Sequence, residues 1–178
     1  MASDEDYGLY YAGIIAIRDE AFVEAADKIR TDLSKSTLAI ANPHMTLLLP
    51  SQVNAVKAAH KGNAKDGGLT NGEAKKFVKG VVAEMPAPPD VGTSLLVQRA
   101  ERDAHYLQDT ELIEYYKHTY FLRVINQDEM QEYLNTLTDA LGIERVERYF
   151  HVSIANNTGK ATDSIADICA DDCVGVNA

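Results

Sequence analysis

Phe150–Ala155 reads FHVSIA, and Asn42–Leu49 reads NPHMTLLL. Turn residues bound both segments. Asn42-Pro43 opens the earlier segment and Pro50 follows it, whereas Asn156–Gly159 (NNTG) follows the later one. Short apolar runs between turns are typical of buried strands. The sequence therefore predicts two strands, at Met45–Leu49 and Phe150–Ala155, each with a histidine at or just before its start.

A strand and a helix are expected ahead of the first of these strands. Leu9–Ile17 is nearly continuous apolar sequence rich in Tyr and Ile, which predicts a buried strand. Asp19 is a candidate N-cap, and apolar residues then recur at helical spacing. This stripe consists of Phe22, Ala26 and Ile29.

The second half of the chain repeats this order. Tyr120–Ile125 predicts a strand, Asp128 with Gln131 resembles a capping box, and Gly142 closes the helix. The apolar stripe of this helix consists of Met130, Tyr133, Leu134, Leu137 and Leu141. Strand, helix, loop and strand thus occur twice, although the two strings do not align closely enough to show a duplication.

The middle of the chain joins the two units. Lys61–Gly72 predicts an exposed loop, and Thr70 with Glu73 predicts a capped helix that Pro86–Pro89 (PAPP) ends before the chain crosses between lobes. The stripe of this helix consists of Ala74, Phe77, Val78, Val81 and Met85. Thr93–Arg99 predicts a strand, and Asp109–Lys117 fits a helix or a strand.

Composition excludes several classes of protein. The 178 residues carry 17 Lys+Arg against 27 Asp+Glu, a formal net charge of -10, with an isoelectric point near 4.9. A protein that coats duplex DNA or long RNA needs many Lys and Arg side chains to neutralise the phosphates, so we expect neither nucleic acid as a partner. A small phosphorylated ligand in a locally positive pocket remains compatible with this charge. The sequence leaves the oligomeric state open.

Location and cofactors are read from what the sequence does not contain. It has no run of about eighteen apolar residues and no secretory signal in Met1–Tyr7, so we expect a cytoplasmic protein without a membrane span. Cys169 and Cys173 are expected to be a reduced pair in the cytosol. A metal site at these cysteines would need partners that the spacing does not supply. We expect no metal and no cofactor.

The two predicted strands carry the same pair of polar residues, His44-x-Thr46 and His151-x-Ser153. Side chains alternate along a strand, so each histidine shares a face with the hydroxyl two residues on. If the two units pack as pseudo-symmetric halves, all four groups converge on one cleft.

Two imidazoles and two hydroxyls suit phosphodiester chemistry without a metal. A neutral imidazole can take a proton from water or a ribose hydroxyl, and a protonated one can give a proton to the leaving oxygen. Hydroxyls can donate hydrogen bonds to the phosphate oxygens. The alternative is that these are ordinary sheet residues. The other histidines, His60, His105 and His118, lack the hydroxyl at the second following position.

These motifs resemble the 2H phosphoesterase superfamily, named for its two histidines in His-x-Ser/Thr motifs. The stretch Phe150–Lys160 (FHVSIANNTGK), followed by Asp163-Ser164-Ile165, is similar to phage-encoded members. The resemblance implies an α+β fold, a single domain over 1–178 with pseudo-symmetric lobes of about 1–90 and 91–178. Antiparallel sheets flanked by helices would surround a central groove. The Lys61–Gly72 insertion departs from compact members.

Carried over to this chain, the resemblance implies that His44 and His151 are catalytic and that Thr46 and Ser153 bind phosphate. By analogy, His151 is the general base and His44 the general acid, although the residues alone leave these roles open. Apart from the resemblance, Tyr11 and Tyr149 are candidates for base stacking and Arg123 for a phosphate contact. The alternatives are that the aromatic residues belong to the core and that Arg123 is solvated or salt-bridged. Other aromatic candidates for stacking are Tyr10, Tyr120, Phe121 and Phe150.

The resemblance implies a hydrolase that cleaves 2′,3′-cyclic phosphates, 2′-5′ linkages or cyclic oligonucleotides. The phage-like string favours degradation of nucleotide immune signals in a host cytoplasm. Two alternatives stay open: a 2′,3′-cyclic phosphodiesterase or 2′-5′ RNA ligase acting on RNA ends, and a non-catalytic module that sequesters a nucleotide.

Overall fold

A computed structural model describes residues 8–29, 38–40, 42–160, 163–166 and 168–175, so the acidic residues 1–7 lie outside it. The helices are α1 (Glu20–Ile29), α2 (Pro50–Ala59), α3 (Asn71–Glu84) and α4 (Gln127–Leu141). The strands are β1 (Gly8–Tyr11), β2 (Ile15–Arg18), β3 (Leu38–Ala39), β4 (Met45–Leu48), β5 (Thr93–Gln108), β6 (Glu111–Val124), β7 (His151–Asn156) and β8 (Val174–Gly175). A 3-10 turn spans Ala170–Asp172.

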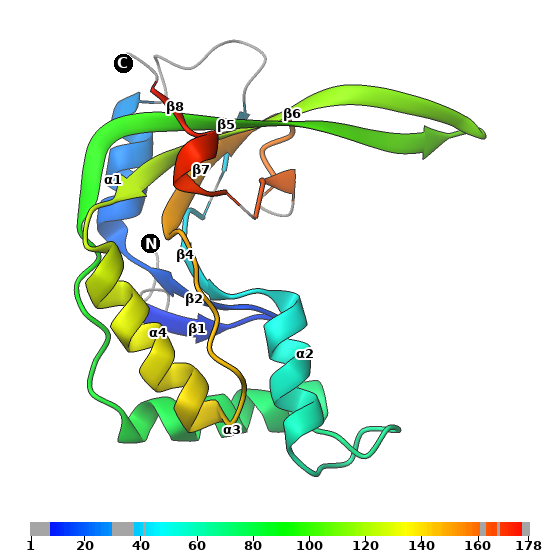
Figure 1. The fold of residues 1–178 in the computed structure, drawn as a ribbon, viewed down its shortest axis with the longest axis vertical. Helices are drawn as coiled ribbons and strands as arrows, with labels where there is room; N and C mark the ends of the chain where they lie inside the picture. The colour runs from blue at the N-terminus through cyan, green and yellow to red at the C-terminus, as the bar shows by residue number, and fades with distance from the viewer. Residues whose placement is uncertain (1–7, 30–37, 41, 161–162, 167, 176–178) are drawn as a thin grey trace.

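The strands form one eight-stranded sheet in which every described pairing is antiparallel (Figure 1). The order is β1-β2-β4-β7-β6-β5-β8, and β3 pairs with β7 beside β4. The predicted α+β class with antiparallel strands therefore agrees with the structure. The sheet runs without a break across the expected lobe boundary near residue 90, because β4 pairs directly with β7.

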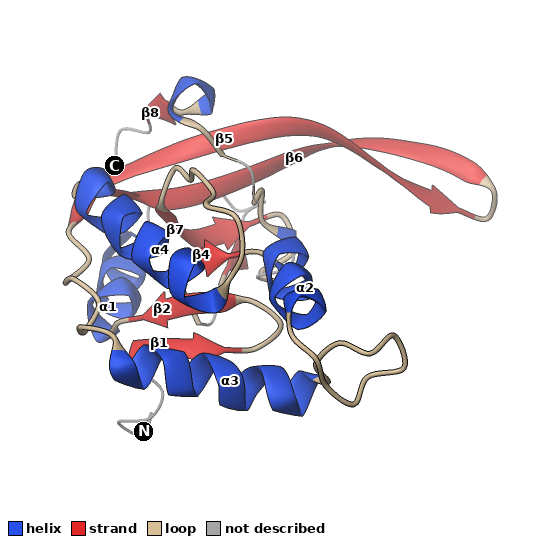
Figure 2. Cartoon of the chain, turned by 60° about the horizontal axis from the view of Figure 1, so that its bottom comes forward, coloured by secondary structure: helices blue, strands red, loops and turns tan. Residues whose placement is uncertain are grey.

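One face of the sheet carries the main core. Met45 and Val152 are fully buried there, together with apolar residues of all four helices, which surround this side of the sheet in Figure 2. Since side chains alternate along a strand, the residues flanking Met45 and Val152 face the other way. On that opposite face, the C-terminal segment contributes Ile165 and Ile168 to a smaller cluster over Phe121.

Several local predictions are confirmed. Asp19 caps α1 through Oδ1, which accepts a hydrogen bond from Ala21 N at 2.9 Å. Thr70 and Glu73 form the predicted capping box, and Gly142 ends α4 with φ of 76°, in the left-handed region. The Asn156–Gly159 turn forms as expected, with Asn156 Oδ1 accepting from Thr158 N and Gly159 N.

The single strand predicted over Leu9–Ile17 is wrong. The chain turns back at Gly13, whose φ is 72°, and β1 and β2 pair as a hairpin. An apolar run does not show where one strand ends and the next begins, and glycine adopts the positive φ of this turn without strain.

The capping box predicted at Asp128 and Gln131 is also wrong, because α4 begins at Gln127 after Asn126. The Gln131 side chain is used elsewhere: its Nε2 donates to Val146 O at 2.8 Å and its Oε1 accepts from Arg148 N at 3.1 Å. This amide therefore fixes the segment leading into β7.

Two regions carry structure that the sequence did not predict. Pro50 follows β4 as expected but also begins α2, where its missing N–H costs nothing. The ambiguous segment Asp109–Lys117 belongs to a long hairpin, in which β5 continues well past Arg99 and turns at Asp109-Thr110. In Figure 1 the outer part of this hairpin extends away from the rest of the molecule.

None of the helices in the described part of the chain has the length and apolar character needed to cross a membrane.

Candidate active site

The two motif strands are neighbours at the centre of the sheet. Met45 of β4 pairs with Val152 of β7 in antiparallel register. Continued by one residue in each direction, this register sets His44 opposite Ser153 and Thr46 opposite His151. Each histidine therefore faces the hydroxyl of the other motif, in a local two-fold arrangement around the Met45–Val152 pair.

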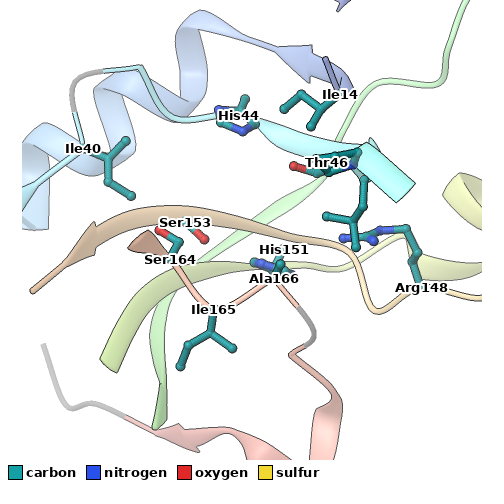
Figure 3. A pocket seen from close by; sticks show the side chains of 12 residues that line it. Ile14, Ile40, His44, Thr46, Arg148, His151, Ser153, Ser164, Ile165 and Ala166 are labelled. Atoms are coloured by element: carbon teal, nitrogen blue, oxygen red, sulfur yellow. The ribbon is translucent and has the colours of Figure 1, made fainter. Parts of the chain in front are cut away.

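All four side chains line one pocket of about 420 Å3 on the face opposite the main core. Figure 3 shows His44 and Thr46 on the β4 side and His151 and Ser153 on the β7 side. The structure thus brings together the four residues that the sequence singled out. The remaining lining residues are mostly apolar: Ile14, Ile40, Leu49, Pro50, Arg148, Ser164, Ile165 and Ala166.

Both imidazoles are held in the same way. His44 Nδ1 lies 3.1 Å from Asn42 O, and His151 Nδ1 lies 3.1 Å from Tyr149 O, in each case the carbonyl two residues earlier. A carbonyl only accepts, so Nδ1 carries the hydrogen and donates it. Each neutral ring then keeps a lone pair on Nε2, which makes that nitrogen the proton acceptor.

Burial keeps both imidazoles neutral. It lowers the pKa of His151 to about 4, and the nearby positive charge of Arg148 acts in the same direction against the hydrogen bond to Tyr149. Burial also lowers the pKa of His44, which is only partly buried, and Arg18 adds to this effect. His151 is 8% exposed. In the ligand-free protein both rings are therefore unprotonated bases at neutral pH.

Arg148, a lining residue, was not predicted from the sequence. Its backbone N–H is held by Gln131, and its Nε is buried without a hydrogen-bond partner among the described residues. Burial lowers the pKa of this guanidinium, which nevertheless stays charged at any ordinary pH. Among the described residues that line the pocket, none is acidic. A chain of net charge -10 thus sets a cation beside two imidazoles, which favours an anionic ligand.

Arg18 places a positive charge near His44, as Arg148 does near His151. Its guanidinium carbon lies 4.1 Å from the ring centroid of Tyr10, and that ring meets the His44 ring edge to face at 6.1 Å. Its positive charge lowers the pKa of His44, as that of Arg148 lowers the pKa of His151. Neither arginine belongs to a recognisable motif, so no local pattern indicated either of them as a site residue.

Ser164 is a third hydroxyl in the pocket and was also missed as a site residue. Its Oγ accepts a hydrogen bond of 2.9 Å from Asn156 Nδ2, and Asn156 is fully buried at the end of β7. Because Oγ accepts from Asn156, the Ser164 hydroxyl can turn its own hydrogen towards a ligand. In Figure 3 it lies next to Ser153.

The other candidates for substrate binding lie outside this pocket's lining. Tyr11, at the end of β1, packs against the main core. Arg123 is exposed on the pocket face, paired across β6 and β7 with His151. Tyr149 precedes β7, where its ring meets Phe121 edge to face at 6.5 Å and its hydroxyl donates to Gln98 Oε1 at 3.3 Å.

The remaining histidines lie in other parts of the molecule. His60 Nε2 is 2.7 Å from Leu141 O at the end of α4, which makes it a helix-terminal contact. His105 is exposed on the outer part of β5, and His118 contacts Asn157 at the base of the hairpin. None of them lines the pocket that holds His44 and His151.

Cys169 and Cys173 are not joined by a disulfide. Within the described ranges, no group of three or more His, Cys, Asp or Glu side chains is placed to hold a metal ion. Comparison of the chain with known protein families, with curated proteins and with solved structures gave no match.

Proposed function

We propose that this protein is a phosphoesterase whose general acid and base are His44 and His151. The observation that carries the proposal is the shared pocket: two imidazoles with Nε2 as the open nitrogen, each opposite a hydroxyl, beside the Arg148 guanidinium. Thr46 and Ser153 would donate to the phosphate oxygens. Arg148 would neutralise charge on the phosphate.

The surroundings of the two rings support a division of roles. His151 is the more buried ring and has a pKa of about 4, so it is ready to accept a proton and serves as the base. His44 is more exposed, and its pKa is lowered less, so it takes up a proton more readily and serves as the acid. The negative charge of a bound phosphate raises the pKa of both rings, and His44 then takes its proton from solvent.

The proposed reaction starts from a ribonucleotide diester with an adjacent hydroxyl. His151 Nε2 takes the proton of the ribose hydroxyl as its oxygen forms a bond to phosphorus. The bond from phosphorus to the leaving oxygen breaks, and that oxygen takes the proton from His44 Nε2. The products are a cyclic phosphate and a free hydroxyl. Water attacking a cyclic phosphate uses the same two groups.

The order of elements supports membership of the 2H phosphoesterase superfamily. Each half of the chain supplies a hairpin, a helix and a motif strand, and the sheet order β1-β2-β4 is mirrored by β7-β6-β5. With the His-x-Thr and His-x-Ser motifs on the two central strands, this arrangement fits two pseudo-symmetric lobes around a groove. The proposed substrates are therefore cyclic phosphates, 2′-5′ linkages or cyclic oligonucleotides, and the phage-like segment favours degradation of host immune nucleotides.

A panel of substrates tests the proposal. Purified protein is incubated with EDTA and 2′,3′-cyclic mononucleotides, linear RNA ends, 2′-5′ oligoadenylate and cyclic di- and trinucleotides, and product masses are measured. We expect turnover that His44→Ala and His151→Ala each reduce by about 10²-fold or more. His105→Ala, an exposed histidine outside the pocket, is the matched control.

The outcomes separate the alternatives. Activity confined to cyclic RNA ends would replace the immune role by RNA-end processing. Ligand that binds and is recovered unchanged would identify a module that sequesters nucleotides. Turnover that survives both histidine substitutions would refute the proposed mechanism.

A further inference from the structure

A second pocket adjoins the candidate active site. It has a volume of about 460 Å3 and shares Leu49, Arg148 and Ala166 with the first pocket. Its other walls include Gln52, Glu147, Tyr149 and Cys169. The two spaces therefore meet at the arginine beside His151.

The geometry of a phosphate diester requires room on two sides. Its two ester oxygens leave phosphorus in different directions, so a phosphate held between His44 and His151 carries one substituent each way. In Figure 3 Ile40, Ser153 and Ser164 lie towards one end of the first pocket and Arg148 towards the other. One substituent fits among the apolar residues of the first pocket. The second pocket lies beyond Arg148, where the other substituent would pass.

The lining of the second pocket suits a nucleoside better than another phosphate. Glu147 contributes a carboxylate, which repels an anion and can accept hydrogen bonds from amino or hydroxyl groups. Gln52 offers an amide, which is fixed because its Oε1 accepts from Leu49 N at 2.7 Å. Tyr149 offers a half-buried ring, fixed by Phe121 and Gln98. Aromatic rings with amide and carboxylate groups bind the faces and edges of bases.

We infer that this second pocket is a subsite for the second nucleoside of a dinucleotide or longer substrate, next to Arg148. The inference rests on the proposed function, because it takes the phosphate to lie between the two histidines. It predicts that recognition extends past the reacting phosphate on the Arg148 side. Arg148 would then contact the phosphate at the junction of the two pockets.

Binding of uncleavable ligands tests the subsite apart from turnover. Calorimetry compares the deoxydinucleotide d(ApA) with the methyl phosphate diester of 2′-deoxyadenosine, which has the same charge and lacks the second nucleoside. We expect d(ApA) to bind wild-type protein about tenfold more tightly, the gain that stacking and contacts of one base bring. Equal affinities would overturn the inference.

Substitutions of Cys169, which is exposed and lines the second pocket, test whether the second nucleoside binds in that pocket. Cys169→Trp fills the second pocket and should bring the affinity ratio of the two ligands close to one, whereas Cys169→Ser keeps the pocket open and should preserve it. A thermal melt checks that both variants fold. A ratio that stays near ten in Cys169→Trp would show that the second nucleoside binds elsewhere and overturn the inference.

Turnover of the substrate panel by the same preparation separates this inference from the proposed function. A tenfold ratio without any turnover would retain the subsite and refute the phosphoesterase. Turnover with equal affinities would retain the phosphoesterase and refute the subsite. Absence of d(ApA) binding would refute the subsite, and turnover of the substrate panel would then decide the function.

Discussion

Protonation of His151 should couple the stability of the fold to pH. Its pKa is about 4 in the folded protein, because of burial and the neighbouring Arg148, against about 6.5 for an ordinary histidine. Between these values the unfolded chain binds the proton and the folded protein does not, so stability falls as pH falls. The stability contributed by the neutral ring is complete above about pH 6.5 and is lost by about pH 4.

The size of this effect follows from the same pKa values. At about 1.4 kcal/mol per pH unit, the difference between 6.5 and about 4 amounts to about 3 kcal/mol. Urea unfolding of wild type and His151→Gln at pH 7 and pH 4 measures it. We expect the wild type to lose about 3 kcal/mol more than the variant between these two pH values.

A control separates this effect from general acid denaturation. His105→Gln removes an exposed histidine of the β5–β6 hairpin and should keep the wild-type pH dependence. If wild type and His151→Gln lose stability equally between pH 7 and pH 4, the neutral buried imidazole, and the base role argued from it, would be refuted.

Four further predictions concern the site and the fold. The pH profile of kcat/KM should be bell-shaped with its optimum below about 6.5, because activity falls as His151 is protonated near pH 4 and again as His44 loses its proton; an optimum above pH 7 would contradict this. Arg148→Gln should lower kcat/KM by about tenfold or more, mostly through KM, since a charge-assisted hydrogen bond to phosphate is lost; an unchanged KM would exclude the contact. Ser164→Ala should lower kcat/KM by several-fold and also lower the melting temperature, because the buried Asn156 amide loses an acceptor; wild-type kinetics would exclude Ser164 as a ligand contact. Gly13→Ala should cost about 1 kcal/mol in urea unfolding because of the φ of 72°, and no loss would contradict the described turn.

The sequence predicted the four central side chains of the site because their placement depends on local rules. Alternation along a strand fixes which face His44 and Thr46 share, and likewise His151 and Ser153. The capped ends of α1, α3 and α4 that depended on Asp19, Thr70 and Gly142 were predicted for the same reason. The alternation does not predict that β4 and β7 are direct neighbours, because that depends on pairing between residues over a hundred positions apart.

The rest of the site depends on tertiary contacts. Arg148 reaches the pocket because Gln131 of α4 holds its backbone, and the sequence assigned Gln131 to a capping box instead. Ser164 is oriented by Asn156, which the sequence assigned only to a turn. In both cases an amide side chain makes a contact that no local pattern specifies. The hairpin at Gly13 was missed because an apolar run does not reveal strand reversal, and the hairpin at Asp109-Thr110 was missed because Asp109–Lys117 fitted a helix or a strand.

A cycle of histidine substitutions tests most directly whether both imidazoles act on one phosphate. The rate kcat/KM is measured with EDTA for wild type, His44→Ala, His151→Ala and the double variant, on the best substrate of the panel. When two groups act together on one phosphorus, loss of either group already removes most of the rate enhancement. Each single variant should therefore have a kcat/KM about 10²-fold or more below wild type, and the double variant should be scarcely slower than either single variant. Losses that multiply in the double variant, or single variants close to wild type, would contradict a shared reacting centre.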